Sequence, residues 1–462
     1  MSRTTMKVQE KNKILVDFLN KMYYIVNDYR LRRFIMKKKY FLVFVLFIAL
    51  ISVMFIGCSK SDNDGKIVIK YMRWANPAEV KSTKELLDLF MKQNPDIKVV
   101  LGNESWSAYW DKLQTLFASG DGPDVFLLGS YYIVDFYKKG ILENLQPYIE
   151  KSKNINLKKF FKPPVELYKF NGDLYALPRD INSIVLYYNK DLFDRAGVKY
   201  PTASWTWDDI IKAGKQLTRD YNNDGIIDQY GILIPSSAYV YETGWGNLIL
   251  QAGGSLLNKE KTKATVNTPA VAKALQFLWD LEYKYKIAPM EKSKASLGDN
   301  VFMTGKVAMV YDGSWMIGTY KTIKSFKWDV QLLPKGKRRA CIANGVANAM
   351  SSKSKHKEAA WKLIEFLSSK EAQIAVAKSG TAIPVLKDIA YSKYYLDGVP
   401  ENKKACLEMI KYGHNYPVTS QMNRWLDKAI GTELDLIMLN KKSIKEGLAD
   451  AEKAVNAILS ED

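Results

Sequence analysis

One loop of the sequence places oxygen-bearing side chains at the spacing of a calcium-binding loop. Oxygen ligands at positions 1, 3, 5 and 9 of such a loop surround Ca²⁺, and glycine at position 6 allows the sharp turn. The twelfth position here is Gly instead of Glu, so a bidentate ligand would come from elsewhere in the chain or from water. A polar turn is the alternative. The predicted structural calcium ligands are Asp220, Asn222, Asp224 and Asp228.

Aromatic and polar side chains follow several predicted strands, in a chain that holds 11 Trp and 28 Tyr. Trp74 ends the first predicted strand, and Ser130 and Tyr131 follow a later one. Trp106 lies on the loop that enters the second predicted helix. Open α/β sheets bind ligands beyond the carboxyl ends of their strands. We therefore expect these four side chains to line a binding site, with plain packing or surface roles as the alternative.

The residue types present exclude several kinds of catalytic site. Two His and three Cys are too few for a His-rich zinc site or a disulfide framework. The sequence has no Gly-rich phosphate loop, no paired-Cys motif and no Gly-x-Ser-x-Gly. A glycoside hydrolase stays open as the enzyme alternative, because it needs only two carboxylates in an aromatic cleft. Glu242 and Asp312 could form such a pair.

The formal net charge of +19 is not gathered into one stripe. Residues 1–57 hold 11 of the 68 Lys and Arg and 3 of the 49 Asp and Glu, and the remaining Lys residues are scattered. Nucleic-acid-binding proteins concentrate their basic residues on one face. We therefore expect no nucleic-acid partner.

The N-terminal region predicts export and a lipid anchor. Met36 and three Lys precede an apolar run that ends at Gly57, as in a secretory signal peptide over residues 36–57. Phe55-Ile56-Gly57-Cys58 resembles a bacterial lipoprotein box, although Phe55 stands where Leu is usual. Cys58 would then carry the lipid (palmitate), and residues 58–65 would form a tether. An uncleaved membrane anchor is the alternative.

Residues 1–35 precede this signal and are charged and amphipathic. They are either a mis-annotated gene start or an extra N-terminal extension. The predicted fold therefore begins after the tether.

Short β-branched runs alternate with helical patterns from residue 66 onward. A β-α-β-α-β rhythm over residues 67–128 predicts an α/β fold with a largely parallel sheet. The capping boxes Ser82-x-x-Glu85 and Thr206-x-x-Asp209 predict helix starts. Thr268-Pro269 predicts another. The further predicted strands are 184–188, 230–234, 306–310 and 328–332.

The order of motifs resembles the carbohydrate-binding extracellular solute-binding proteins of ABC importers, the maltose-binding-protein-like group. The resemblance covers residues 66–462 and rests on many short motifs in the family's order rather than on one. These motifs include Trp106-x-x-Tyr109-Trp110, Gly120-Asp121-Gly122-Pro123-Asp124, Gly172-Asp173-Leu174-Tyr175-Ala176-Leu177-Pro178, Tyr187-Tyr188-Asn189-Lys190-Asp191, Trp205-Thr206-Trp207-Asp208-Asp209, Gly253-Gly254, Gly305-Lys306-Val307-Ala308-Met309 and Gly313-Ser314-Trp315.

The resemblance implies a two-lobed, periplasmic-binding-protein-like clamp whose interwoven lobes are joined by a multi-strand hinge. The chain would cross between the lobes near residues 176–182, 339–345 and 380–384. Ligand would lie between the lobes and be trapped by hinge closure. The implied lobes are residues 66–178 with 345–382, and residues 182–340 with 384–462.

The resemblance also implies ligand-binding residues. Trp315 matches a Trp that stacks on sugar in the family, and Asp312 before it could accept hydrogen bonds from hydroxyl groups. Core packing and a turn carboxylate are their alternative roles. The other implied contacts are Trp245 and Glu242 before Gly253-Gly254, Asp180 and Asn182 in the first crossing, and Asn423 and Arg424 near a family contact region.

The function implied is that of an extracytoplasmic receptor, lipid-anchored at the cell membrane. It would capture a saccharide, expected to be an oligosaccharide, and deliver it to ABC permease subunits and their ATPase without catalysis. It would need no cofactor beyond the structural Ca²⁺. A clamp for a non-carbohydrate solute, such as a polyamine, phosphosugar or peptide, is the main alternative.

Overall fold

The computed structural model describes residues 65–75, 77–238, 240–290, 297 and 300–461. The predicted signal peptide, Cys58 and the tether up to residue 64 lie outside these residues. The part from Lys66 onward forms a compact unit of its own. Among its described residues, no helix combines the length and the apolar character that a membrane crossing requires.

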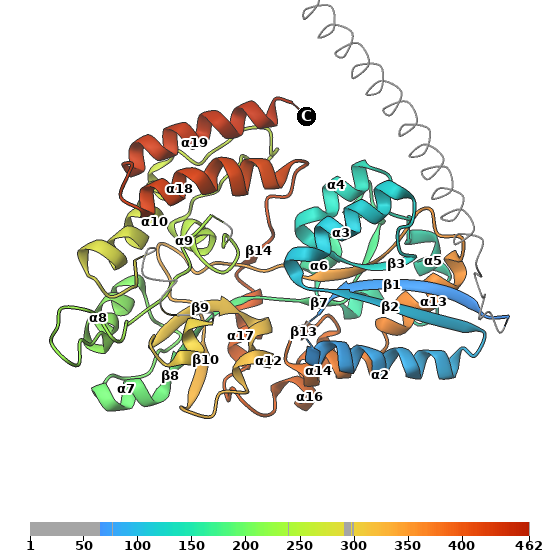
Figure 1. Cartoon of the computed structure of the whole chain (residues 1–462), viewed down its shortest axis with the longest axis horizontal. Coiled ribbons are helices and arrows are strands. Elements are labelled where there is room, and N and C mark those ends of the chain that lie inside the picture. The colour runs from blue at the N-terminus through green and yellow to red at the C-terminus, as the bar shows by residue number, and fades with distance from the viewer. Residues whose placement is uncertain (1–64, 76, 239, 291–296, 298–299, 462) are drawn as a thin grey trace, which may run out of the picture. The chain divides into compact units, whose positions relative to one another are not determined.

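The first sheet has five strands in the order β2-β1-β3-β12-β6 (Figure 1). β1 pairs in parallel with β2 and β3, whereas β12 runs antiparallel to β3 and β6. The prediction of a largely parallel sheet is confirmed, since β6 runs in the same direction as β1, β2 and β3, both β3 and β6 being antiparallel to β12. Within this sheet β12 is the reversed strand, and it enters after the chain has returned from the second sheet. The strands are β1 (Ile67–Trp74), β2 (Ile97–Glu104), β3 (Val125–Gly129), β6 (Ala176–Pro178) and β12 (Val346–Met350).

The second sheet is antiparallel, in the order β10-β8-β9. Its strands are β8 (Ile184–Asn189), β9 (Met309–Gly313) and β10 (Trp328–Gln331). The predicted strand at 306–310 starts late, at Met309. The strand predicted at 230–234 is wrong, since only isolated bridges form there. The N–H groups of Gly231 and Ile232 instead donate to the carbonyl of Ile287, at 3.0 and 3.1 Å.

Three two-stranded pairs complete the strands: β4 (Lys169–Phe170) with β5 (Asp173–Leu174), β7 (Asp180–Ile181) with β13 (Ile383–Pro384), and β11 (Cys341–Ile342) with β14 (Gly413–His414).

Helices surround both sheets. Those before β7 are α2 (Pro77–Gln93), α3 (Trp106–Ser119), α4 (Ile133–Lys138), α5 (Gln146–Lys151) and α6 (Lys162–Leu167). Those between β8 and β11 are α7 (Lys190–Ala196), α8 (Trp207–Leu217), α9 (Trp245–Ala252), α10 (Pro269–Trp279) and α12 (Ile317–Tyr320). Those after β12 are α13 (Lys357–Leu367), α14 (Lys370–Ser379), α15 (Lys387–Ala390), α16 (Lys393–Leu396), α17 (Lys404–Ile410), α18 (Gly431–Met438) and α19 (Ile444–Leu459). The short turns η1 (Ser130–Tyr132), η2 (Leu157–Lys159), η5 (Val301–Thr304) and η6 (Ser314–Met316) are 3₁₀, and η3 (Asp280–Lys284) and η7 (Asn423–Ile430) are π-helical.

Local sequence signals explain several helix starts. The predicted capping box of Thr206 and Asp209 is confirmed at α8, and Thr268 precedes α10 with Pro269 in its first turn. The start predicted at Ser82 is wrong. Pro77 begins α2, and the Ser82 hydroxyl donates to the carbonyl of Glu79 within the helix at 3.1 Å. Pro suits a first helical position because its missing N–H has no partner there in any case.

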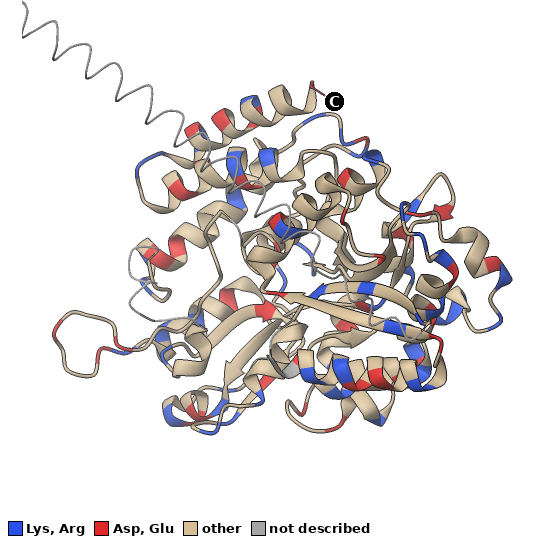
Figure 2. Ribbon diagram, turned by 45° about the vertical axis from the view of Figure 1, so that its right-hand side comes forward, with Lys and Arg blue, Asp and Glu red and all other residues tan. Residues whose placement is uncertain are grey.

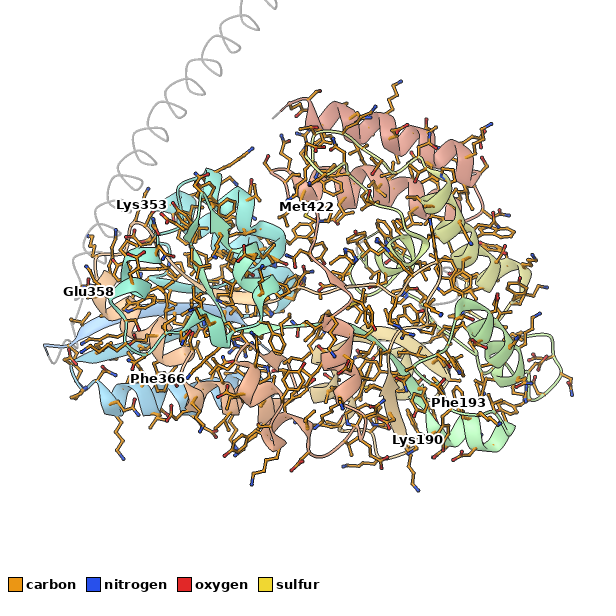
Figure 3. All side chains as sticks on the ribbon, turned by 180° about the vertical axis from the view of Figure 1, so that it is seen from behind. Lys190, Phe193, Lys353, Glu358, Phe366 and Met422 are labelled. Atoms are coloured by element: carbon orange, nitrogen blue, oxygen red, sulfur yellow. The ribbon has the colours of Figure 1, made fainter. Side chains whose placement is uncertain are left out.

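Aromatic side chains pack helices against one another and against the second sheet. Phe366 of α13 lies with its ring 5.4 Å from that of Phe90 in α2, and the Phe193 ring of α7 lies 5.6 Å from the Tyr188 ring of β8 (Figure 3).

Lys and Arg segments are interspersed with Asp and Glu segments along the ribbon (Figure 2). The charge is therefore mixed over the helices, as the scattered Lys residues predict.

Three passages between the two sheets meet at one place. β7 pairs antiparallel with β13, and the N–H of Asn182 donates to the carbonyl of Asn344 at 2.5 Å. A Cβ on Gly345 would lie 2.1 Å from the carbonyl oxygen of Asp180, so only glycine fits this approach. The residue boundaries of the two lobes remain a prediction.

Candidate functional site

Aromatic rings gather at the edge of the first sheet where β1 and β3 end. The Trp74 ring lies 4.9 Å from that of Trp106, edge to face, and 5.4 Å from that of Trp110. Trp110 in turn stacks on Tyr132 at 3.9 Å. Trp106 is 54% exposed, so its ring is available to a ligand. Trp74 ends β1 and Trp106 follows β2, and parallel strands end at the same edge, which is why the structure brings the two rings together. Their contact with ligand stays a prediction.

The turn after β3 extends this edge toward the C-terminal part of the chain. Ser130 is buried in η1, and the contacts with the C-terminal part of the chain are made by its neighbour Tyr131. The Tyr131 hydroxyl donates to the carboxylate of Asp427 in η7, and its ring meets that of Tyr416 edge-on at 5.9 Å. Burial raises the pKa of Asp427. The aromatic edge is thereby joined to Tyr416 and Asp427, almost 300 positions away in the sequence. The sequence analysis predicted neither residue.

Glu242 is the centre of a hydrogen-bonded network beside Tyr131. Its carboxylate accepts from the Tyr416 hydroxyl at 2.9 Å and from the Asn344 side chain at 3.3 Å. The Asn344 side-chain oxygen accepts the N–H of Tyr416 at 3.1 Å, which closes the network. Burial raises the pKa of Glu242, against the effect of its two hydrogen bonds. Glu242 thus lies in a polar network, and its contact with ligand stays a prediction. Tyr416 and Asn344 carry no motif that could have marked them.

Asp180 and Asn182 lie where the chain first passes between the sheets. The Asp180 carboxylate is buried and accepts from Arg179 at 2.5 Å and from the N–H of Val346 at 2.9 Å. Burial raises its pKa, while Arg179 acts in the opposite direction. Asn182 is half-buried and its side-chain oxygen accepts from the Ser314 hydroxyl at 3.4 Å. Asp180 therefore holds the crossing together, and Asn182 is the more accessible of the two.

Asp312 and Trp315 flank the end of β9. One carboxylate oxygen of Asp312 accepts the N–H of Gly313 at 2.7 Å and the other accepts the Tyr320 hydroxyl at 2.6 Å. The half-buried Trp315 ring lies over Gly313, since a Cβ there would come within 2.3 Å of the ring. Ser314 between them donates to Asn182, which brings this pair beside the first crossing.

Three other predicted contacts lie apart from this group. Trp245 is 1% exposed, and its indole N–H donates to the carbonyl of Ser237 at 3.2 Å. The Trp245 ring lies 4.8 Å from the Tyr241 ring, and the Tyr241 ring lies 5.7 Å from the Tyr416 ring. Tyr241 therefore separates Trp245 from the Glu242 network. Asn423 and Arg424 are exposed, and Arg424 forms a two-pronged ion pair with Glu461 at 2.5 and 3.1 Å.

The predicted calcium loop is closed by hydrogen bonds of its own. Asp220 accepts the N–H of Gly225 at 2.8 Å, Asp228 accepts that of Tyr221 at 2.8 Å, and Asp224 accepts that of Ile226 at 2.7 Å. The side chain of Asn222 donates to Asp224 at 3.0 Å. Over the described residues, no three His, Cys, Asp or Glu side chains are grouped as metal ligands. The calcium set stays a prediction.

This arrangement combines two chemistries. The rings at the end of β1 offer apolar faces, and the carboxylates of Glu242 and Asp427 accept hydrogen bonds from hydroxyl groups, as their tyrosine partners show. Such a site suits a ligand that has both apolar ring faces and hydroxyls.

We predict that Asp312→Asn changes the pH dependence of stability. Burial raises the pKa of Asp312 to about 6, above the value near 4 of an unfolded chain. The stabilisation of its protonated form is therefore complete below about pH 4 and is lost as the pH rises through about 6. Because Asn cannot ionise, the variant should gain about 2–3 kcal/mol relative to the parent between pH 4 and pH 7. Urea unfolding at each pH measures this difference, and parallel stability curves would contradict it.

Comparisons with known proteins match the same part of the chain. Residues 74–374 match the family model of the bacterial extracellular solute-binding proteins. The maltotriose-binding protein of Pyrococcus abyssi is 26% identical over 335 residues, 70% of this chain and 67% of that protein. The arabinooligosaccharide-binding protein of Bacillus subtilis is 26% identical over 353 residues, 72% and 77% of the two chains.

Solved structures agree with this match. An ABC substrate-binding protein from Listeria monocytogenes, in complex with cycloalternan, has a TM-score of 0.78 at 31% identity and covers 86% of this chain and 99% of that one. Maltose-bound T. maritima MalE3, at 23% identity, shares the fold with a TM-score of 0.73, covering 85% and 99%. The predicted resemblance and the two-lobed α/β fold are therefore confirmed, and the chain belongs to the bacterial extracellular solute-binding proteins.

Proposed function

We propose that this protein captures a saccharide between its two lobes and delivers it to ABC permease subunits and their ATPase. The observation that carries the proposal is the aromatic edge of Trp74 and Trp106, joined through Tyr131 to the carboxylates of Asp427 and Glu242. Sugar rings stack on aromatic faces, and their hydroxyls donate to carboxylates. The saccharides in the names of the relatives support the same ligand class.

Binding would proceed without chemistry, by preference of the ligand for the closed state. Asn182, Asp312 and Trp315 would contact the ligand from the side of the second sheet. A non-carbohydrate solute is the second candidate, and a glycoside hydrolase the third. The family's members bind solutes outside the cytoplasm, which supports an extracytoplasmic receptor.

The direct test is thermal unfolding against a panel of monosaccharides and oligosaccharides. A ligand at about 100 times its Kd should stabilise the protein by about 2.7 kcal/mol. We expect one sugar class to stabilise and to be recovered intact. Recovery of cleaved sugar would point to a hydrolase instead, and stabilisation only by polyamines, phosphosugars or peptides would overturn the sugar assignment.

Truncating the stacking rings should weaken sugar binding. We expect Trp106→Ala and Trp315→Ala each to raise the Kd about three- to tenfold, because an aromatic pair contributes about 0.5–1.5 kcal/mol beyond its buried area. Trp279→Ala is the matched control, since this partly buried ring stacks on Tyr283 away from the site. Isothermal titration measures the Kd. Equal affinities in all three variants would remove the stacking role.

The lipid anchor is a separate proposal that rests on the Phe55-Ile56-Gly57-Cys58 motif. Labelling of cells with a radioactive fatty acid should mark the protein, and Cys58→Ser should abolish the label because it removes the thiol that would carry the lipid. Cys406→Ser is the control, since this buried thiol lies within the folded unit. A label that persists in Cys58→Ser would rule out acylation at this position.

A further inference from the structure

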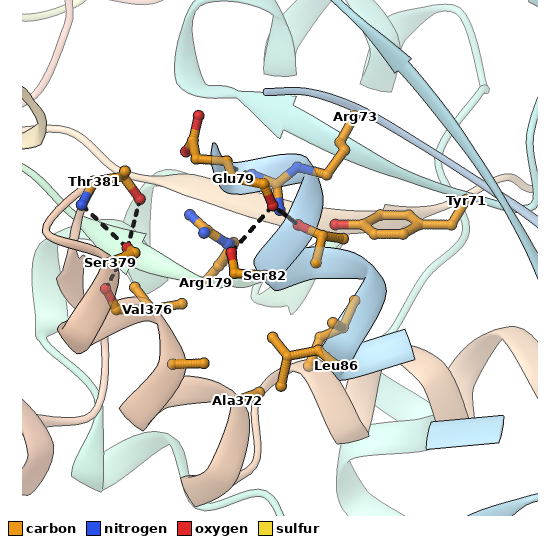
Figure 4. Close-up of a pocket in the computed structure, with 13 residues that line it drawn as sticks. Tyr71, Arg73, Glu79, Ser82, Leu86, Arg179, Ala372, Val376, Ser379 and Thr381 are labelled. Atoms are coloured by element: carbon orange, nitrogen blue, oxygen red, sulfur yellow. Dashed lines mark hydrogen bonds and ion pairs between the residues drawn. The ribbon is translucent and has the colours of Figure 1, made fainter. Parts of the chain in front are cut away.

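A pocket separate from the aromatic edge lies beside the place where the chain first crosses between the sheets. It is lined by α2, by α14 and by Arg179, and its empty volume, including the mouth open to solvent, is about 440 Å³. Figure 4 shows Arg73 and Arg179 on its wall, with Ser82 of α2 and Thr381 after α14 around them. Two guanidinium groups therefore face one small space.

Arg73 is held in place by the protein around it. It is 5% exposed, and its side chain donates to the carbonyl of Trp74 at 3.1 Å and to the hydroxyl of Thr83 at 2.6 Å. A carboxylate oxygen of Glu79 lies 3.7 Å from a guanidinium nitrogen of Arg73. Glu79 is the acidic residue among those that line the pocket. Burial lowers the pKa of Arg73, and the positive charge of Arg179 lowers it further. The two guanidinium groups thus act on each other electrostatically within a poorly solvated space.

Arg179 differs because most of its donors have no protein acceptor. A guanidinium carries five N–H groups. In the described part of the chain, the hydrogen bond found for this side chain is the one to Asp180 at 2.5 Å, and the side chain is only 13% exposed. The guanidinium points into the pocket (Figure 4). The Arg179 guanidinium thus faces a pocket that is open to solvent.

The neighbouring hydroxyls are hydrogen-bonded to other groups, and among the described residues no hydrogen bond joins them to the Arg179 side chain. Ser82 donates to the Glu79 carbonyl, and Ser379 donates to the Val376 carbonyl at 2.7 Å. The hydroxyls of Ser379 and Thr381 lie 2.8 Å apart and bond to each other. An occupant that completes the hydrogen bonding of Arg179 has to bring acceptor oxygens, and a negative charge on it would add attraction to the two guanidinium groups.

We propose that this pocket binds a small oxyanion of the size and charge of phosphate or sulfate. Two parallel N–H groups of Arg179 would donate to two of its oxygens, the geometry in which guanidinium groups bind such anions. Arg73, which is ion-paired with Glu79 at 3.7 Å, adds to the positive charge that lines the pocket. Its residues lie on the α2 and α14 side of the first crossing, and Arg73 and Arg179 directly precede Trp74 and Asp180 of the candidate saccharide site.

Equilibrium dialysis of the purified protein with radiolabelled inorganic phosphate, at constant ionic strength, tests the proposal. We expect saturable binding of one phosphate per chain, displaced by sulfate and not by chloride. Arg179→Gln should weaken it about tenfold or more, because it removes a charged hydrogen-bonding group. Arg195→Gln, on the exposed face of α7, is the matched control and should bind as the parent does.

A second variant separates loss of the site from loss of the fold. Ala375 lines the pocket from α14. Ala375→Glu leaves Arg179 and its bond to Asp180 in place but brings a carboxylate into the pocket, so it should block phosphate as Arg179→Gln does. Ala457→Glu on the exposed face of α19 is its control. Absence of saturable binding below about 10 mM, or binding that survives both pocket variants, would overturn the proposal.

Discussion

The structure depends on the close packing of three chain segments where they pass between the two sheets. The backbone of Asp180 touches Gly345 so closely that no side chain fits, and β7 pairs with β13 at the same point. The Asp180 carboxylate is buried there and receives the N–H of Val346, the first residue of β12. Burying a carboxylate is costly unless its oxygens are bonded, so this bond and the ion pair with Arg179 tie the crossing to the first sheet.

The candidate site inherits its geometry from that crossing. Asn344 directly precedes Gly345, and it bonds both Glu242 and Tyr416. A chain segment that passes between the sheets therefore supplies the centre of the polar network. The network then meets the aromatic edge at Tyr131. A shift at the crossing would move the network and the edge relative to each other, which is how a clamp converts closure into ligand affinity.

The sequence predicted what local pattern and motif order control. The capping box at Thr206, the buried strand after Ile184 and the carboxyl-end position of Trp74 all follow from short-range rules. Contacts between distant residues do not. Tyr131 and Asp427 are 296 positions apart and no spacing rule joins them. Likewise Trp245 is predicted to contact ligand from its position before Gly253-Gly254, but its side chain is 1% exposed, because tertiary packing buries every residue of the short helix α9.

The central claim is that sugar is held between two lobes that move about the crossing. Spin labels on cysteines introduced at Lys139 and Lys428, which are exposed, report the distance between the two sides. In a Cys58→Ser background the native thiols of Cys341 and Cys406 should stay unlabelled, since both are buried and burial raises their pKa to about 12. The account predicts that a saturating, stabilising sugar shifts this distance distribution and narrows it. An unchanged distribution with sugar demonstrably bound would contradict it.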